Sequence, residues 1–203
     1  RITTTTICGT DIHILKGEYP VEKGLTVGHE PVGIIEKLGS NVRGYQEGQR
    51  VIAGAICPSF ISYPCQDGFP SQDGAWIQDD GTCSCHGYKA TAGWRFGNWI
   101  DGTQAEYVLV PDAEANLAPV PDNLTDEQVL MCPDIMSTGF VGAENANIKI
   151  GDMVAIFAQG PIGLCATAGA RLRGASLIIA IDGNNERLEV SKKMGAHVTL
   201  NFR

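Results

Sequence analysis

Several features of membrane and secreted proteins are missing from this sequence. No apolar run reaches the roughly 18 to 20 residues that a helix needs to span a bilayer. The first residues do not combine a charged start with an apolar core, as a secretion signal would. We therefore expect a cytoplasmic protein without a membrane segment.

Long runs of a single charge are also missing. The net charge is −8, and basic pairs such as Lys192 with Lys193 are typical of solvated helix faces, so nucleic acid is not an expected partner. Internal repeats and low-complexity tracts are absent as well. With 43% apolar and 19% charged residues, the 203-residue chain is typical of a globular protein with one large domain or two modest ones.

The cysteines do not form the regular pattern of a disulfide framework. Their number is odd, their spacing is irregular, and no secretion signal precedes them, which favours thiols and metal ligands. Two of them, Cys132 and Cys165, fall among apolar residues and are expected to serve packing.

The stretch from Met153 to Asp182 reads as strand, tight turn, helix and strand. The apolar runs 153–158 and 177–182 are short and continuous, as in a parallel sheet buried on both faces. In the turn between them, Gly160 would let the backbone approach a pyrophosphate, and Gly163 would let the helix pack closely on the sheet. Pro161 is favoured in a first helical turn, whose free N–H groups attract anions.

The acid that ends the second strand indicates the cofactor. Asp182 follows Gly160 by 22 positions, close to the roughly 20 expected for a carboxylate that holds the adenosine ribose of NAD. Ala158 replaces the first glycine of the fingerprint, so a slightly crowded turn is expected. A βαβ unit with only a structural role is the alternative.

The rest of the chain falls into two regions. Residues 1–120 contain apolar runs typical of strands at 32–35, 50–53 and 105–110, which predict a small antiparallel barrel with long loops. The segment 58–102 is too long for an ordinary turn and predicts a lobe or a functional loop. In residues 121–203, Thr125 would cap a helix through Leu130, and a second helix would run from about 134 to 145.

Cys8, His29 and Glu30 form the most distinctive chemical group outside the βαβ unit. Cys8 lies in Cys-Gly-Thr-Asp-Ile-His, and His29 lies in Val-Gly-His-Glu-Pro. Thiolate and imidazole are preferred ligands of zinc, and a catalytic site uses three protein ligands with one position open. The spacing is equally consistent with a buried cysteine and a hydrogen-bonded histidine that serve structure alone.

Five motifs follow one another in an order that is specific to a family. They are Cys-Gly-Thr-Asp-Ile-His, Gly-His-Glu, Gln-Ala-Glu-Tyr, Pro-Asp-Ile-Met-Ser-Thr-Gly-Phe and Gln-Gly-Pro-Ile-Gly-Leu. Across its whole length the chain resembles the zinc-dependent medium-chain alcohol dehydrogenases. It looks most similar to the branch that acts on short secondary alcohols such as isopropanol, because of the run around Trp94 and because Asp134 stands where other branches carry a second cysteine ligand.

The resemblance implies a role for each residue near the metal. Cys8, His29 and Asp134 match the three zinc ligands. Glu30 matches a neighbouring carboxylate that enters the coordination shell when water or substrate exchanges. Asp11 matches a group that accepts a hydrogen bond from the ring of His29.

Three more residues match groups that handle the substrate. Thr10 matches the hydroxyl that takes the substrate proton, and His13 matches the histidine that passes it to solvent. Trp94 would line the pocket. In the implied reaction, zinc acts as a Lewis acid on the alcohol oxygen and NAD accepts the hydride.

The resemblance also implies the fold and the cofactor. The expected fold class is α/β plus β, with a GroES-like β-barrel domain in residues 1–120 and, in residues 121–203, linker helices and the first half of a Rossmann doubly wound parallel sheet. The expected partners are a small alcohol or carbonyl substrate and further copies of the parent chain, in a dimer or tetramer. The residues expected to bind NAD are Gly160, Pro161, Ile162, Gly163, Asp182 and Thr138.

A second, structural zinc is not expected. Its candidate ligands Cys57, Cys65, Cys83 and Cys85 are widely spread, and the branch that the chain resembles most lacks this site. His86 could replace one of the four. His197 is expected to face solvent.

The ends of the chain are those expected of an internal piece of a longer protein. Arg1 opens directly into a β-branched run, and residues 198–202 resemble a third parallel strand that is cut off as it begins. The nicotinamide half of the Rossmann domain and part of the barrel would then be missing. The chain alone is therefore expected to be inactive.

Other functions of the same fold stay open. They are an NAD-dependent formaldehyde dehydrogenase, a non-catalytic metal-binding relative, and a zinc-free quinone reductase. A quinone reductase should lack this ligand set, and the intact Cys8, Thr10, His13, His29 and Asp134 favour a zinc enzyme. The motifs do not determine the preferred alcohol or the physiological direction.

Overall fold

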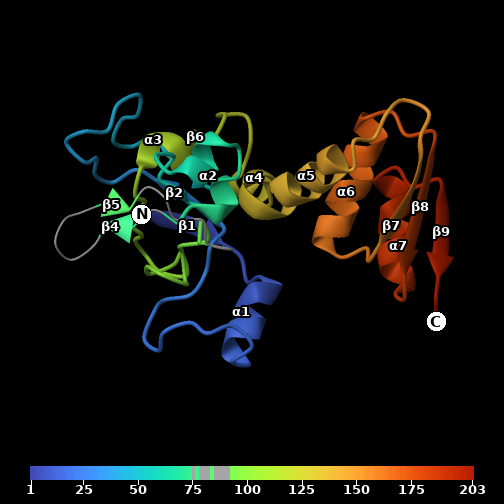
Figure 1. The fold of residues 1–203 in the computed structure, drawn as a ribbon, viewed down its shortest axis with the longest axis horizontal. Helices are drawn as coiled ribbons and strands as arrows, with labels where there is room; N and C mark the ends of the chain where they lie inside the picture. The colour runs from blue at the N-terminus through green and yellow to red at the C-terminus, as the bar shows by residue number, and fades with distance from the viewer. Residues whose placement is uncertain (75, 78–82, 85–91) are drawn as a thin grey trace. The chain divides into compact units, whose positions relative to one another are not determined.

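A computed structural model describes residues 1–74, 76–77, 83–84 and 92–203. They form two compact units, Arg1–Pro133 and Asp134–Arg203, which are treated one at a time (Figure 1). The division at residue 120 that the sequence suggests stays a prediction.

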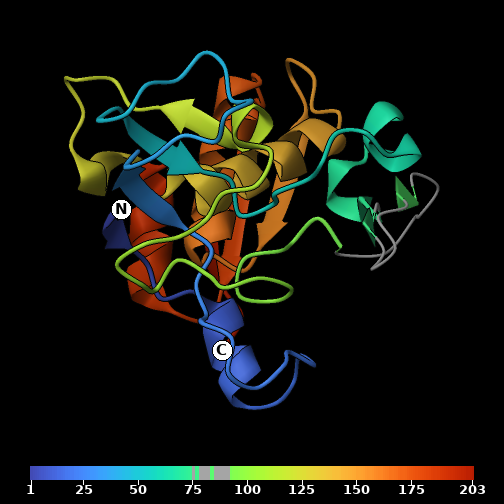
Figure 2. The ribbon, with the colours of Figure 1, turned by 90° about the vertical axis from the view of Figure 1, so that its left-hand side faces the viewer.

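An antiparallel sheet organises the first unit. Its strands lie side by side in the order β1 (Ile2–Thr5), β2 (Pro31–Ile34), β3 (Arg50–Ala53) and β6 (Leu117–Pro119), and Figure 2 shows helix α1 (Gly9–Leu15) projecting away from them. The strands predicted at 32–35 and 50–53 are confirmed to within one residue. Gly33 allows the close approach of β1, because a Cβ on it would lie 2.5 Å from the carbonyl oxygen of Arg1.

The strand predicted at 105–110 is wrong. The segment alternates as expected, with Val108 and Val110 packed on the core and Tyr107 and Leu109 exposed. In the described part of the chain, this segment makes a single backbone hydrogen bond to a strand, from the N–H of Ile2 to the carbonyl oxygen of Glu106. A strand requires a ladder as well as alternation, and this segment has no ladder. The described strands accordingly form an open sheet.

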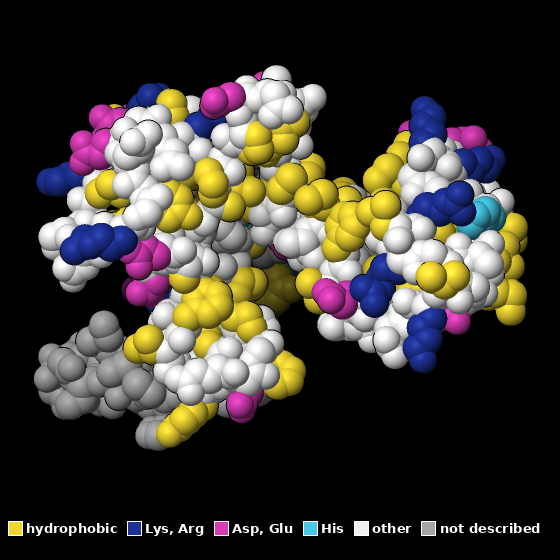
Figure 3. All heavy atoms as spheres, turned by 90° about the horizontal axis from the view of Figure 1, so that it is seen from above, with side chains coloured by type: hydrophobic (Ala, Val, Ile, Leu, Met, Phe, Trp, Pro, Cys, Tyr) yellow, Lys and Arg dark blue, Asp and Glu magenta, His cyan; other side chains and the backbone are white. Residues whose placement is uncertain are grey.

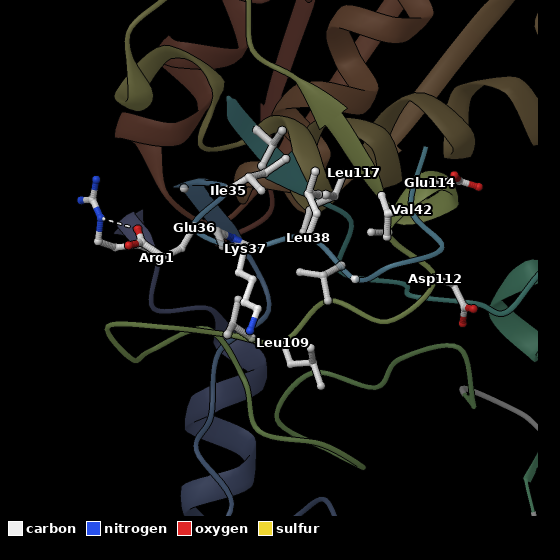
Figure 4. A pocket seen from close by; sticks show the side chains of 18 of the residues that line it. Arg1, Ile35, Glu36, Lys37, Leu38, Val42, Leu109, Asp112, Glu114 and Leu117 are labelled. Atoms are coloured by element: carbon white, nitrogen blue, oxygen red, sulfur yellow. Dashed lines mark ion pairs between the residues drawn. The ribbon is translucent and has the colours of Figure 1, made fainter. Parts of the chain in front are cut away.

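The first unit contains a large apolar cavity beside this segment. It has a volume of about 820 Å³, and Figure 4 shows Ile35, Leu38, Leu109 and Leu117 around it. The ion pair between Arg1 and Glu36 lies at its rim, with 3.5 Å between the charged atoms. The site residues predicted for this unit do not line the cavity, so it is separate from the candidate site.

The segment 58–102 has secondary structure of its own, as expected of a lobe. It contains α2 (Tyr63–Gln66), the 3₁₀ turn η1 (Pro70–Gln72) and the short hairpin of β4 (Trp76–Ile77) and β5 (Cys83–Ser84). The buried carboxylate of Asp73 accepts hydrogen bonds from the N–H of Ser59 at 2.5 Å and from the guanidinium of Arg95 at 3.2 Å. This carboxylate joins the two ends of the lobe.

Short helices follow the sheet. After α3 (Ala113–Asn116), α4 (Asp126–Val129) begins at Thr125, whose side chain accepts a hydrogen bond from the N–H of Gln128, so the predicted cap is confirmed. Cys132 packs on the apolar cluster of Val32 and Val129, as expected of a packing residue. The helix predicted from 134 is regular only as α5 (Ser137–Asn145), because a π-helical turn, η2 (Cys132–Met136), precedes it. A π turn is frequent at functional sites.

The second unit is a parallel sheet with helices on one face. Its order is β7 (Met153–Phe157), β8 (Leu177–Asp182) and β9 (Val198–Asn201), with α6 (Pro161–Leu172) and α7 (Asn185–Lys193) as crossovers (Figure 1). The predicted strand, turn, helix and strand are confirmed, and so is the third parallel strand. The core contains Ala170, Ala175 and Ile178. On the other face Met153 and Phe157 remain exposed.

No helix among the described residues is long and apolar enough to cross a bilayer. On the face in Figure 3, lysine and arginine side chains are scattered among other residues and do not form a single basic patch. The expectation that nucleic acid is not a partner stays a prediction.

Candidate metal and nucleotide sites

The structure brings Cys8, His29 and Glu30 together in the first unit. Cys8 is the N-cap of α1, and His29 and Glu30 directly precede β2. The side chains of His29 and Glu30 are buried, at 4% and 1% exposure. One ligand atom from each of the three lies within 4.8 Å of the others. Asp134, the third ligand that the resemblance implies, belongs to the other unit, and its role stays a prediction.

This donor set fits a zinc ion. Sulfur, imidazole nitrogen and carboxylate oxygen are all ligands that zinc accepts. Oε2 of Glu30 accepts a 2.7 Å hydrogen bond from the hydroxyl of Thr6, whereas Oε1 is buried and has no hydrogen-bond partner among the described residues. A cation at this place would satisfy a carboxylate oxygen that is otherwise costly to bury.

Asp11 lies beside the candidate ligands Cys8, His29 and Glu30, which are called the metal group below. Its side chain is buried, with 3% exposure. Its Oδ2 accepts hydrogen bonds from the N–H of Cys8 at 2.8 Å and from the amide of Gln104 at 3.0 Å. Oδ1 lies 3.9 Å from Nδ1 of His29, which is too long for the expected hydrogen bond. Asp11 therefore holds the backbone of Cys8 in this structure. Gln104 was missed by sequence reasoning, although it opens the Gln-Ala-Glu-Tyr motif.

The residues expected to handle the proton differ in exposure. The hydroxyl of Thr10 lies 3.7 Å from the sulfur of Cys8, next to the metal group. His13 is exposed near the end of α1 and is hydrogen-bonded to the carboxylate of Glu18.

A row of aromatic rings leads from His13 to His29. The ring centroids are 5.8 Å apart from His13 to Tyr19, 5.7 Å from Tyr19 to Trp94, and 6.2 Å from Trp94 to His29. Trp94 is oriented by a 2.9 Å hydrogen bond from its indole N–H to the carbonyl of Phe96. Trp94 thus lies near His29, and its role in lining a substrate pocket stays a prediction. Tyr19, which contacts Trp94, was not indicated by any sequence motif.

The two glycines of the predicted dinucleotide fingerprint lie where β7 passes into α6. Gly160 is the N-cap of α6, and Pro161 is in the first turn. A Cβ on Gly163 would lie 1.8 Å from the carbonyl oxygen of Ala158, whereas a Cβ on Gly160 would meet only the end of Arg187, at 4.0 Å. Ala158 has a φ of 66°, the left-handed conformation that a glycine would adopt without strain.

Asp182 is held firmly at the end of β8. Its carboxylate accepts hydrogen bonds from the N–H of Gln159 at 2.5 Å and from the N–H of Asn184 at 2.8 Å. These bonds, the first of them above all, lower the pKa of Asp182 below its ordinary value, with a smaller contribution from Arg187. Asp182 lines a cleft of about 720 Å³ together with Phe157, Asn184, Arg187 and Arg203.

Of the residues predicted to bind NAD, only Asp182 lines this cleft among the described residues. Ile162 is exposed in the first turn of α6. Thr138 does not line the cleft, and its hydroxyl donates a 2.8 Å hydrogen bond to the carboxylate of Asp134. Its role toward NAD stays a prediction.

The candidate structural zinc ligands are only partly visible. Cys85 and His86 lie outside the described residues, and Cys83 is part of β5. Cys57 is buried, and its burial raises the pKa of the thiol to about 12, which disfavours the thiolate that zinc requires. Cys65 is buried in α2. The expectation that no structural zinc is bound stays a prediction.

Two residues singled out in the sequence lie elsewhere in the second unit. His197 is exposed, as expected, but its Nδ1 also accepts a 2.9 Å hydrogen bond from the N–H of Ile178. Cys165 is half-buried on α6, and a Cβ on Gly139 of α5 would lie 2.6 Å from its Cβ. Cys165 therefore serves the packing of these two helices.

Comparison with known families assigns both parts of the chain. Residues 1–122 match the family described as alcohol dehydrogenase GroES-like domain, and residues 161–203 match the one described as zinc-binding dehydrogenase. The chain belongs to the zinc-type alcohol dehydrogenase family. The predicted family and the predicted fold class are thereby confirmed.

Individual relatives of the chain are also named as alcohol dehydrogenases. An alcohol dehydrogenase of Cupriavidus necator is 81% identical over 203 residues, which are all of this chain and 56% of that protein. An NADP-dependent isopropanol dehydrogenase of Thermoanaerobacter brockii is 36% identical over 197 residues, 97% of this chain and 52% of that protein. The chain thus spans about half the length of these relatives.

Solved structures of the family share the fold. The alcohol dehydrogenase TADH from a Thermus species is 34% identical with a TM-score of 0.81, and the match covers 99% of this chain and 54% of that one. Zinc-dependent alcohol dehydrogenase 2 of Streptococcus pneumonia, in its apo form, is 34% identical with a TM-score of 0.82. That match covers 99% of this chain and 53% of the other one.

Proposed function

We propose that the full protein that contains this chain is a zinc-dependent alcohol dehydrogenase that oxidises a short secondary alcohol with NAD. The observation that carries this proposal is the group of half-buried Cys8 with buried His29 and Glu30, whose ligand atoms lie within 4.8 Å of one another in a chain of this family. The cleft at Asp182 supports the choice of cofactor.

Cys8, His29 and Asp134 would hold the zinc, with Glu30 as the carboxylate that enters during exchange. When bound, zinc would supply Lewis acidity at the alcohol oxygen. The chain's own contribution is to keep the ligand atoms in place. Asp11 does so because its Oδ2 accepts a 2.8 Å hydrogen bond from the backbone N–H of Cys8.

Thr10 is the proposed acceptor of the substrate proton. Its hydroxyl lies 3.7 Å from the sulfur of Cys8, so an alcohol held at the metal group would be within its reach. His13 is exposed, and from there a proton can reach solvent. The pairing of His13 with Glu18 would keep the imidazole oriented for this task.

NAD is the proposed cofactor because of the charge on Asp182. The carboxylate can accept hydrogen bonds from the ribose hydroxyls of NAD, but it would repel the 2′-phosphate of NADP. Relatives at 34–36% identity are named as NADP-dependent isopropanol dehydrogenases, so cofactor choice must be measured in this protein. The side chains of Gly160, Pro161, Ile162 and Gly163 are small or apolar, which suits a pyrophosphate bound by backbone N–H groups.

A short secondary alcohol is the proposed substrate. The rings of Trp94 and Tyr19 near His29 leave an apolar approach that favours small aliphatic groups. The similarity to isopropanol dehydrogenases supports the same class. A homo-oligomer and a cytoplasmic location remain expectations for the full protein.

The test is to purify the full protein, measure its metal content and follow NADH formation with a series of alcohols and with formaldehyde. We expect about one catalytic zinc per chain, turnover of isopropanol that exceeds turnover of ethanol, and no reaction with formaldehyde. Oxidation of formaldehyde in place of isopropanol would identify a formaldehyde dehydrogenase. Absence of metal and of turnover with every alcohol would overturn the proposal.

A further inference from the structure

Gln159 is a fully buried polar residue in the turn between β7 and α6, with 0% exposure. The carbonyl oxygen of its side chain lies 3.0 Å from the hydroxyl of Thr167 on α6 and 2.9 Å from the hydroxyl of Ser191 on α7, and accepts a hydrogen bond from each. Its amide nitrogen donates to the carbonyl of Ile156 on β7, at 3.1 Å. One side chain therefore joins a strand and two helices.

The backbone of the same residue holds the carboxylate at the nucleotide cleft. The N–H of Gln159 donates the 2.5 Å hydrogen bond to Oδ2 of Asp182. Gly160, the next residue, is the N-cap of α6, where the free N–H groups point outward. Gln159 thus stands between the two places where a dinucleotide would touch this unit.

Filling space in the core does not require an amide at this position. Burying an amide is costly unless every polar atom is satisfied, and an apolar side chain of similar length would avoid that cost. The two hydroxyls also have other acceptors, because Thr167 lies 2.9 Å from the carbonyl of Gly163 and Ser191 lies 2.9 Å from the carbonyl of Arg187. What the amide adds is a fixed position of the turn relative to both helices.

We infer that Gln159 is a positioning residue for the cofactor, which fixes Asp182 relative to the start of α6 and thereby sets the affinity for the adenosine end of NAD. The inference rests on the proposed function, in which Asp182 holds the ribose. A dinucleotide binds at the ribose and at the pyrophosphate at once, so the distance between the two contacts must match the ligand. Loosening the turn weakens cofactor binding and leaves the chemistry at the metal group unchanged.

The test uses the full protein and four variants. Gln159→Leu removes the amide and keeps the bulk of the side chain. Thr167→Val and Ser191→Ala each remove one donor, and Thr167→Ser is the matched control that keeps its hydroxyl. The dissociation constant of NADH is measured by fluorescence titration, and KM for NAD, KM for isopropanol and kcat are measured by initial rates.

We expect Gln159→Leu to raise the dissociation constant of NADH and KM for NAD by roughly 3- to 10-fold, the range for one or two lost neutral hydrogen bonds. The kcat and the KM for isopropanol should change by less than about twofold. Thr167→Val and Ser191→Ala should show smaller changes in the same direction, and Thr167→Ser should resemble the parent. If Gln159→Leu does not fold, the NADH dissociation constants of Thr167→Val and Ser191→Ala decide the outcome.

A double-mutant cycle separates positioning from a general loss of structure. In an Asp182→Ala background, Gln159→Leu should alter the dissociation constant of NADH by less than about twofold, because the group that it positions is gone. Equal effects in both backgrounds, or unchanged NADH affinity in the single variants, would overturn the inference alone. A full protein that binds neither NADH nor NADPH would overturn the proposed function and the inference with it.

Discussion

A Cβ added to Gly163 would lie 1.8 Å from the carbonyl oxygen of Ala158. No side chain can occupy that position unless the turn moves, because the contact is with backbone and not with the flexible end of a side chain. Three residues earlier, Gly160 has free space around it. The two glycines of the fingerprint therefore serve different purposes, one inside the protein and one toward the ligand.

This difference predicts opposite behaviour of two matched variants. Gly163→Ala should destabilise the protein by about 1–3 kcal/mol or prevent its folding, as overpacking does. Gly160→Ala should keep the melting temperature within about 2 °C and weaken NADH binding, because the methyl group would occupy the approach of the pyrophosphate. Thermal unfolding and NADH titration of both variants provide the test. Tight NADH binding by Gly160→Ala would show that the dinucleotide does not lie on this turn.

Ala158 predicts a gain in stability on substitution. Its φ of 66° is strained for alanine, so Ala158→Gly should stabilise the protein by up to about 1 kcal/mol. Ala155→Gly, in the extended backbone of β7, is the control and should lower stability. The free energies of unfolding from urea titrations decide the outcome. Destabilisation of equal size in both variants would contradict the strain at Ala158.

Removal of a proposed zinc ligand should separate chemistry from cofactor binding. Cys8→Ala or His29→Ala should abolish alcohol oxidation and lower the zinc content, while NADH still binds, because the nucleotide unit does not include these residues. Cys165→Ala is the matched control, since this thiol lies between α5 and α6 and is not one of the proposed ligands, and it should keep its zinc and most of its activity. Normal turnover of either ligand variant, or of the chelated parent, would contradict the metal site.

Asp182 should determine the choice of cofactor. Asp182→Gly should weaken NAD binding and reduce the discrimination against NADP, as measured by kcat/KM for the two cofactors. Asp182→Asn, which keeps an oxygen for the backbone N–H groups, should relieve the same penalty with less loss of stability. Equal use of NAD and NADP by the parent would refute this role.

The lowered pKa of Asp182 also predicts a pH dependence. Because the folded pKa lies below the unfolded value, the stability that the carboxylate contributes is fully present above the unfolded pKa of about 3.9 and is lost as the pH falls through the folded value. The difference in unfolding free energy between the parent and Asp182→Asn should thus be constant from pH 9 to about pH 5 and shrink only in stronger acid. A difference that titrated near pH 7 would contradict the assignment.

The exposed face of the parallel sheet of β7, β8 and β9 predicts how residues 1–203 behave when they are expressed alone. Met153 is 76% exposed and Phe157 is 73% exposed on that face, and the described residues provide no strand beside the outer edge of β7. We expect self-association, binding of a hydrophobic dye, and no NADH formation with isopropanol. A monomeric, cooperatively unfolding product with the turnover of the full protein would contradict this prediction.

Local patterns in the sequence were sufficient to predict most of the strands and helices of the second unit, Asp134–Arg203. The run at 177–182 is a strand because it is short, apolar and β-branched, and α6 begins at Pro161 because proline suits a first turn. Thr125 was identified as a cap for the same kind of local reason. Cys8, His29 and Asp134 were assigned to one site by resemblance to a family. The spacing of Cys8, His29 and Glu30 alone was equally consistent with a structural role.

Tertiary structure decided what depends on distant partners. Residues 105–110 have the alternation of a strand, but pairing is a property of two segments, and this one has no ladder in the described structure. Tyr19 and Gln104 reach the site from segments far apart in the sequence, and no motif placed them next to Trp94 and Asp11. Gln159 occupies a variable position of the fingerprint, and its role depends on two hydroxyls that only the packing of α6 and α7 brings to it. Periodicity and turn chemistry are local and can be deduced from the chain, whereas a contact between distant residues exists only once the core has packed.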